Sequence, residues 1–139
     1  MKALVIDGSA ALSFLLKDEQ SAYALKALKA LETGADAYVP THWWLETANG
    51  LLMAERRKRA TQSDITEALG LLQLLPVTTD EETALRVATD TMALARQYAL
   101  TIYDAAYLEL AIRRQAVLAT SDQALSKAAV AVGVKVLAA

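Results

Sequence analysis

The sequence predicts an α/β fold with three layers, in which helices cover both faces of a central parallel sheet. One observation is the order of segments: short apolar runs, typical of buried strands, alternate with longer segments of helical periodicity. Another is the composition, since 55% of the 139 residues are hydrophobic and only five are Gly and two are Pro. A chain of this length buries one core without disulfides or structural metals. We therefore expect residues 1–139 to form a single domain around about four or five short strands.

The first half of the chain supplies two strands and three helices. Ala3–Ile6 is an apolar run that ends at Asp7–Gly8, and a second strand at 37–39 ends before Pro40. Gly34 is placed to end the second helix. The three helices are expected at 9–16, 20–33 and 42–59.

The second half continues the alternation of helices and strands. Thr61 with Asp64, and Thr79 with Glu82, fit the capping-box pattern and predict two helix starts. The remaining strands are expected at 76–78, 117–120 and 134–137, and the remaining helices at 102–113 and 121–132.

The residue types limit the chemistry. With no Cys and one His, disulfide frameworks, zinc sites and thiol catalysis are excluded. A metal must therefore be held by carboxylates, which favour hard ions such as Mg²⁺ or Mn²⁺. Fourteen Lys and Arg against 16 Asp and Glu leave no general basic coat for nucleic acid. No apolar stretch reaches the ~18–20 residues of a membrane span, and Asp7 interrupts the N-terminal run, so we expect a cytoplasmic protein without a membrane partner.

Two acids follow strands of the predicted sheet. Asp7 ends the first strand, and Asp122 comes two residues after the strand at 117–120. Ligands of open parallel sheets bind beyond the carboxyl ends of the strands, so both acids are candidates for a site. The alternative is structural: a turn former for Asp7 and a favourable first-turn charge for Asp122.

Asp104 lies on the predicted helix at 102–113, on a stripe that faces the core. Leu108 and Ile112 follow it at four and eight residues, which is the spacing of one helix face. A carboxylate on that face is costly unless it is paired or binds a cation. The alternative is a capping box with Thr101, which the spacing also permits.

Glu46 lies on the predicted long helix, with Asn49 and Gly50 one turn later. A glycine in mid-helix costs about 0.5–1 kcal/mol relative to Ala, so we expect another element to pack closely at Gly50. For Glu46 the alternative is an ordinary solvated surface acid.

Considered together, the four acids indicate a metal site. If they converge, each like-charge pair at ~4 Å costs about 4 kcal/mol at an effective dielectric near 20. Such a cluster persists when protons or cations neutralise it, and Mg²⁺ binds both carboxylates and phosphate oxygens. The matching reaction is metal-assisted hydrolysis of a phosphodiester.

Four stretches carry a further pattern: Val5–Ala10, Pro40–Asn49, Leu100–Ala111 and Leu118–Leu125. In order and spacing they resemble the PIN domain family, and within it the VapC-type ribonuclease toxins of type II toxin–antitoxin modules. The resemblance extends over nearly the whole chain, and the four stretches together are far more specific than any one of them.

The resemblance implies a metal-dependent endoribonuclease with an acidic pocket for Mg²⁺ or Mn²⁺. The matching catalytic and metal-binding acids are Asp7, Glu46, Asp104 and Asp122, and the matching supporting positions are Ser9, Asn49 and Thr120. Because no acid of the pattern is missing, an active enzyme is expected. Gly8 departs from the family pattern, in which a side chain is usual, and we expect this departure not to touch the chemistry.

Partners are implied by the same resemblance. A VapC-type protein is expected to form a homodimer and to bind a cognate antitoxin whose tail fills the acidic groove. The helix at 42–59 carries more large apolar residues than one face buries, which suits such contacts. These residues are Trp43, Trp44, Leu51, Leu52 and Met53.

Contacts to RNA have two further candidates. The basic run Arg56, Arg57, Lys58 and Arg59 ends the long helix, where it either complements the helix dipole or contacts phosphates. Three tyrosines, Tyr98, Tyr103 and Tyr107, either stack on bases or belong to the core.

Two other classes of protein compete with the ribonuclease. The first is a catalytically inactive PIN-fold module with a binding or regulatory role, against which the complete acid set argues. The second is a doubly wound protein that uses Asp7 as nucleophile or phospho-acceptor. A haloacid-dehalogenase-type hydrolase would need an acid where Ser9 stands, and a receiver-type domain would need a late lysine that the chain does not clearly offer.

Overall fold

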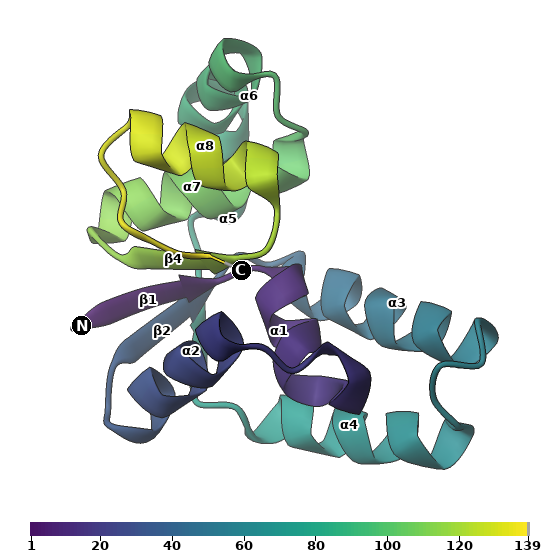
Figure 1. Ribbon diagram of the computed structural model, residues 1–139. Coiled ribbons are helices and arrows are strands. Elements are labelled where there is room, and N and C mark those ends of the chain that lie inside the picture. Colours follow the sequence, from purple (N-terminus) through teal and green to yellow (C-terminus); the bar gives the residue numbers. More distant parts are fainter. Residues whose placement is uncertain (139) are drawn as a thin grey trace.

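The computed structural model describes residues 1–138, which form a five-stranded parallel sheet between layers of helices (Figure 1). The strands are β1 (Ala3–Ile6), β2 (Asp36–Val39), β3 (Val77–Thr79), β4 (Val117–Thr120) and β5 (Val136–Ala138). The helices before β3 are α1 (Gly8–Leu15), the short η1 (Lys17–Glu19), α2 (Ala22–Glu32), α3 (Trp43–Arg56) and α4 (Gln62–Leu74). Those after β3 are α5 (Thr83–Arg86), the π-helical η2 (Val87–Thr91), α6 (Met92–Tyr98), α7 (Ile102–Arg114) and α8 (Gln123–Ala131). The predicted α/β class and number of strands are confirmed.

The sheet order is β3-β2-β1-β4-β5, with all neighbours parallel. The chain runs from β1 outward to β2 and β3, and then returns to the other side of β1 to form β4 and β5. The carboxyl ends of β1 and β4 therefore flank a topological switch point, where open parallel sheets form their ligand-binding crevice.

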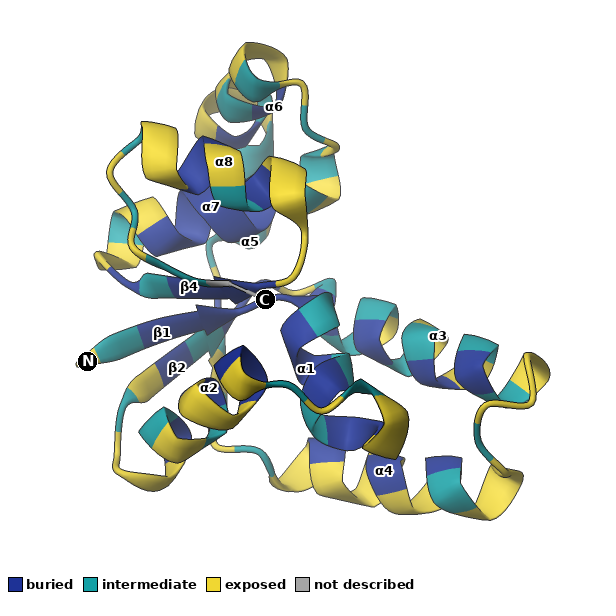
Figure 2. Ribbon diagram, in the orientation of Figure 1, coloured by how far each residue is buried: buried dark blue, intermediate teal, exposed yellow. Residues whose placement is uncertain are grey.

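The core lies on both faces of the central strand. Leu4, Val5 and Ile6 are fully buried, as expected for a strand covered on both faces. Helices α7 and α8 lie on one side of the sheet and α1 and α2 on the other, each with its buried residues turned inward (Figure 2). None of the helices within residues 1–138 is long and apolar enough to cross a membrane.

Helices α3 and α4 form an arm that packs on α1 and extends beyond the sheet (Figure 1). The close approach expected at Gly50 is present: a Cβ there would lie 2.5 Å from Leu12 Cδ1 of α1. Most of the apolar excess of α3 is used inside the molecule, since Trp43 and Leu51 are fully buried. Leu52, by contrast, is exposed.

One of the two predicted capping boxes forms. Thr61 Oγ1 accepts from Asp64 N and Thr61 N donates to the Asp64 carboxylate, so α4 begins as predicted. The box of Thr79 with Glu82 is wrong, because Thr79 is the last residue of β3 and the helix begins only after Glu82. Strand pairing with β2 takes precedence over the local capping signal at Thr79.

A network of ion pairs fixes α7 to the end of β3. Arg113 donates from both terminal nitrogens to Asp80, at 2.9 and 2.7 Å, and its Nε donates to Glu109 at 2.9 Å. The Asp80 side chain is 1% exposed and that of Arg113 is 16% exposed. The Arg113 guanidinium holds the pKa of Asp80 below its usual range. This network holds in place the helix that carries Asp104.

Candidate active site

Asp7 lies at the switch point, between the end of β1 and the start of α1. As the N-cap of α1 its Oδ1 accepts from Ala10 N at 2.9 Å and from Ser9 Oγ at 2.6 Å, while Oδ2 accepts from Thr120 Oγ1. The residue is 4% exposed. Burial raises the pKa of Asp7, and the three hydrogen bonds oppose that rise.

The hydroxyls of Ser9 and Thr120 are oriented by the loop that follows β4. Ser9 Oγ accepts from Ser121 N and Thr120 Oγ1 accepts from Asp122 N, both at 3.0 Å. Because each hydroxyl oxygen accepts a hydrogen bond from a backbone N–H, the hydroxyl hydrogen is free to be donated to Asp7. The two predicted supporting hydroxyls therefore tie the ends of β1 and β4 together around one carboxylate.

Glu46 is positioned by contacts at the first turn of α3. Trp44 Nε1 donates to Thr79 Oγ1 at 2.9 Å, and His42 Nε2 donates to the carbonyl of Tyr103 at 3.1 Å. Tyr107, a fully buried residue of α7, donates its hydroxyl to Glu46 Oε1 at 3.0 Å. Burial and the adjacent Glu46 charge raise the pKa of the Tyr107 phenol, so it stays a donor at neutral pH.

Gly8 lies directly against Glu46, a contact that the sequence did not signal. A Cβ on Gly8 would lie 2.7 Å from Glu46 Oε1, closer than such atoms approach in proteins. The missing side chain thus provides the space that the Glu46 carboxylate occupies beside Asp7.

Asp104 completes the cluster from the first turn of α7. Thr101 Oγ1 accepts from Asp104 N at 3.1 Å, but the reciprocal bond of a capping box is not formed between these two residues, in contrast to Thr61 and Asp64. Burial raises the pKa of Asp104 to about 6, with further contributions from the charges of Asp122, Glu46 and Asp7, in that order. The charges of the other three acids therefore act on Asp104, and we call these four residues the acidic site.

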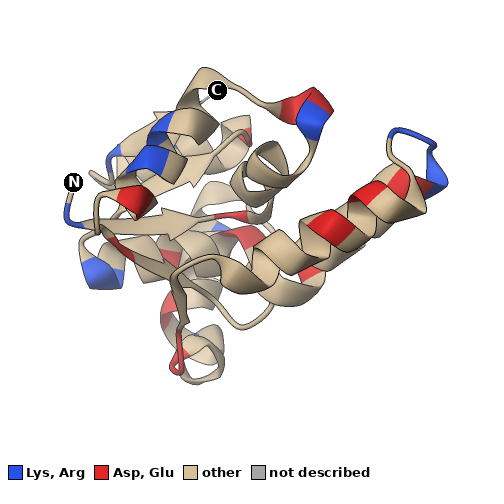
Figure 3. Cartoon of the chain, turned by 90° about the horizontal axis from the view of Figure 1, so that it is seen from below, with Lys and Arg blue, Asp and Glu red and all other residues tan. Residues whose placement is uncertain are grey.

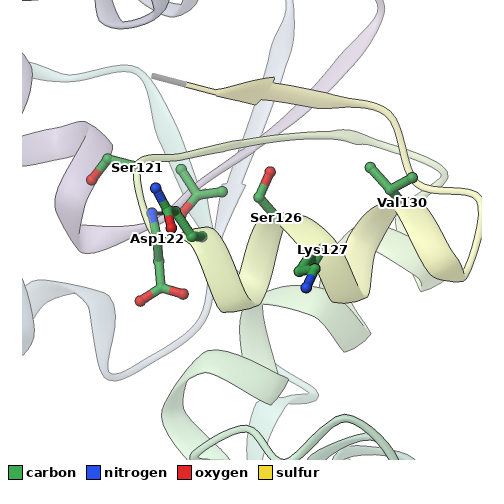
Figure 4. A pocket seen from close by; sticks show the side chains of 7 residues that line it. Ser121, Asp122, Ser126, Lys127 and Val130 are labelled. Atoms are coloured by element: carbon green, nitrogen blue, oxygen red, sulfur yellow. Dashed lines mark hydrogen bonds between the residues drawn. The ribbon is translucent and has the colours of Figure 1, made fainter.

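Asp122 is held at the outer side of the acidic site as the N-cap of α8. Its Oδ1 accepts from Leu125 N at 2.8 Å. Beside it a hollow of about 460 Å³ with a mixed polar and apolar lining runs along α8 (Figure 4). Ser126 and Lys127 line this hollow together with Asp122, so it carries one cationic side chain.

The donor set of the acidic site suits a hard divalent cation: carboxylate oxygens from two strand ends and two helices, with hydroxyls behind them. Among residues 1–138, no three His, Asp or Glu side chains are already arranged to hold an ion directly. An ion such as Mg²⁺, which uses one or two carboxylates and keeps several waters, does not require such a group. The residues present fit that mode of binding.

Other predicted residues lie apart from the acidic site. Asn49 is exposed one turn beyond Glu46 on α3. The basic run Arg56–Arg59 lies at the far end of the α3–α4 arm (Figure 3), and Arg56 is about 15 Å along the helix axis from Glu46. Arg59 forms ion pairs with Asp18 and Glu19, so its guanidinium is already engaged and is not a free phosphate contact.

Sequence reasoning did not single out the contacts of His42 and Gly8, and it left Tyr107 open between base stacking and the core, where the structure places it. The Tyr107 hydroxyl meets Glu46 across 61 residues of chain, and no local spacing signals that contact. A buried aromatic ring with a polar atom that needs a partner was the available signal.

Comparisons with known proteins agree with this geometry. A family model of the PIN domain matches residues 4–131. Comparison with curated protein sequences gives no match. Among solved structures, the crystal structure of PAE2754 from Pyrobaculum aerophilum is similar with a TM-score of 0.70 and 20% identity, covering 98% of this chain and 84% of that chain.

Two further structures share the fold. VapBC2 from Rickettsia felis, bound to a DNA fragment from its promoter, matches with a TM-score of 0.64 and 11% identity over 98% of both chains. VapC20 from Mycobacterium tuberculosis, a sarcin–ricin loop cleaving toxin, matches with a TM-score of 0.54 and 16% identity, over 90% of this chain and 94% of that chain. With the family model covering most of its length, the chain belongs to the PIN domain family.

Proposed function

We propose that this protein is a metal-dependent endoribonuclease of the VapC type, with Asp7, Glu46, Asp104 and Asp122 as its catalytic and metal-binding acids. The observation that carries the proposal is the acidic site itself. Burial raises the pKa values of Asp7 and Asp104, and the charge of Glu46 adds to the rise at both, while the charge of Asp122 adds to the rise at Asp104. PIN domains are generally nucleases, which supports hydrolysis of a phosphodiester.

The residues of the site have distinct duties. Asp7 is fixed by Ala10 N and two hydroxyls, so its carboxylate keeps one orientation without rearrangement. Tyr107 holds Glu46 Oε1 in place from the opposite helix layer. Bound at these carboxylates, Mg²⁺ or Mn²⁺ would activate water and stabilise the leaving oxygen.

A phosphate is repelled by an uncompensated cluster of acids, so substrate binding and cation binding are coupled at this site. Lys127 beside Asp122 offers a positive charge to the neighbouring part of an RNA backbone. At the arm tip, Arg56, Arg57 and Lys58 are exposed and offer more distant phosphate contacts.

For the partners, we propose a cognate antitoxin and a homodimer in the cytoplasm, with residues 1–139 acting as a single domain. The similar structures include VapBC2, described with a DNA fragment from its promoter, and VapC20, described as a toxin that cleaves the sarcin–ricin loop. These descriptions support RNA as the substrate and a toxin–antitoxin module as the context. Co-expression with the adjacent gene and light scattering of the purified complex test both partners.

The direct test is cleavage of single-stranded RNA by purified protein in Mg²⁺, Mn²⁺ or EDTA. We expect cleavage with either metal, none in EDTA, and none from Asp7→Asn or Asp104→Asn. Asp36→Asn is the matched control, because Asp36 is an exposed acid at the amino end of β2. Cleavage at the unaltered rate by Asp104→Asn would refute the assignment, and binding of RNA without cleavage in any metal would favour the inactive module.

A further inference from the structure

We propose that a hollow beside the acidic site receives an unstacked nucleobase of the RNA strand, an inference that rests on the proposed function. The hollow has a volume of about 300 Å³ and lies between the first turns of α3 and α7. Its lining residues are His42, Leu45, Glu46 and Tyr103. We call this hollow the base cup.

Two walls of the base cup are large apolar side chains that the fold leaves in solvent. Leu45 is 78% exposed and Tyr103 is 62% exposed. Each directly precedes an acid of the site, Glu46 on α3 and Asp104 on α7. The two helices therefore present an acid and an apolar surface side by side, at the same end of the molecule.

The floor of the base cup is held in place. His42 Nε2 donates to the Tyr103 carbonyl at 3.1 Å, and the His42 ring lies 5.7 Å from the Tyr103 ring. Behind it, the His42 and Tyr107 rings meet edge to face with centroids 4.9 Å apart. Tyr103 is thus anchored through its backbone while its ring stays accessible.

The structure also separates the three tyrosines that the sequence grouped together. Tyr107 is fully buried and uses its hydroxyl on Glu46, and Tyr98 is only partly exposed. Of these three, Tyr103 alone is largely exposed and also borders the acidic site. Stacking on aromatic side chains tolerates any base, because every base has a π-face.

The lining of the base cup indicates a base rather than a phosphate. Its surface is almost entirely carbon, and the Glu46 carboxylate at its edge repels phosphate. Glu46 belongs to both the cup and the acidic site, so a strand whose phosphate lies at the acids has its adjoining base next to the cup. This continuity favours the RNA strand over a protein side chain as the occupant.

The test is binding of a short single-stranded oligoribonucleotide that carries one 2-aminopurine, whose fluorescence falls when it stacks. All proteins carry Asp104→Asn so that the probe is not cut. We expect Tyr103→Ala to weaken binding about 5- to 150-fold and to abolish the quenching, and Tyr103→Phe to retain both. Leu74→Ala is the control, because Leu74 is 79% exposed at the end of α4, outside the acidic site and the base cup.

The outcomes separate this inference from the proposed function. If Tyr103→Ala or Tyr103→Leu binds the probe like the parent, base stacking in the cup is refuted. It is also refuted if Tyr103→Ala weakens only the binding of a partner protein. In that case, metal-dependent RNA cleavage by the protein with Asp104 intact would still support the ribonuclease proposal. If the protein with Asp104 intact neither cleaves nor binds RNA, the ribonuclease proposal and the base-cup inference are both overturned.

Discussion

Replacing Asp104 by Asn is expected to stabilise the metal-free protein, although it removes a catalytic acid. In the folded chain the pKa of this carboxyl rises from 3.8 to about 6, first through burial and then through the charges of Asp122, Glu46 and Asp7. This rise in the pKa corresponds to about 3 kcal/mol by which the ionised Asp104 carboxylate destabilises the folded state. Salt and partial exposure screen such a term, so we expect a gain of about 1–2 kcal/mol at pH 7.5.

The pH dependence gives the sign of this effect. Because the native pKa of Asp104 lies above the unfolded one, the native state binds the proton more tightly. The Asp104 contribution therefore lowers stability as pH rises from about 4 to about 6, and remains at its full size above that range. The stability difference between Asp104→Asn and the unaltered protein is expected to be small at pH 4 and largest at pH 7.5.

Urea denaturation in EDTA at both pH values measures this difference, and repetition in Mg²⁺ measures the effect of the cation. The unaltered protein is expected to gain stability from Mg²⁺ by linkage, and the variant to gain less. Asp64→Asn serves as the opposite control, because its capping bonds to Thr61 lower the pKa of Asp64, so its charge favours the folded state at pH 7.5. A destabilised Asp104→Asn in EDTA at pH 7.5, or a difference that does not vary with pH, would refute the electrostatic reasoning.

Other perturbations test how the site is positioned. Tyr107→Phe removes the donor to Glu46 and keeps the ring, so cleavage should fall at least tenfold while urea denaturation shows a loss of about 1 kcal/mol; unchanged kinetics would contradict the positioning role. Gly8→Ala places a Cβ against Glu46 Oε1 and should lower the cleavage rate more than the thermal stability, whereas an equal rate would mean that Glu46 moves without consequence. Arg113→Met leaves Asp80 buried without its partner and should cost about 3 kcal/mol by urea denaturation. A loss below about 1 kcal/mol would show that water replaces the pair.

Local patterns were sufficient for most of the secondary structure. The alternation of apolar runs with helical periodicity predicted all five strands within one or two residues, because burial on both faces requires continuous apolar segments. The Thr61–Asp64 box predicted the start of α4, since capping depends on residues only three apart. At Thr79 the same signal failed, because hydrogen bonding to a neighbouring strand outweighed it.

For the candidate site too, some features could be predicted from the sequence and others could not. Strand ends marked Asp7 and Asp122 as candidates, and helix periodicity put Asp104 on a core-facing stripe. The resemblance then grouped these three acids with Glu46. The sequence pattern did not contain the contact of Gly8 with the Glu46 carboxylate or the Tyr107 hydrogen bond. These contacts join Glu46 of α3 to Gly8 of α1 and Tyr107 of α7, so they depend on how different helices pack.

By itself, the sequence determined the parallel sheet and the helices between its strands, because hydrophobic periodicity and capping act over a few residues. Only the tertiary structure decided that the charges of Asp122, Glu46 and Asp7 act on Asp104, that Arg59 is paired while Tyr103 is exposed, and that an apolar hollow adjoins Glu46. The physical reason is the separation along the chain over which each kind of interaction acts. Charge repulsion, ion pairing and side-chain exposure depend on distances between residues that packing brings together, and those distances are set by the whole fold.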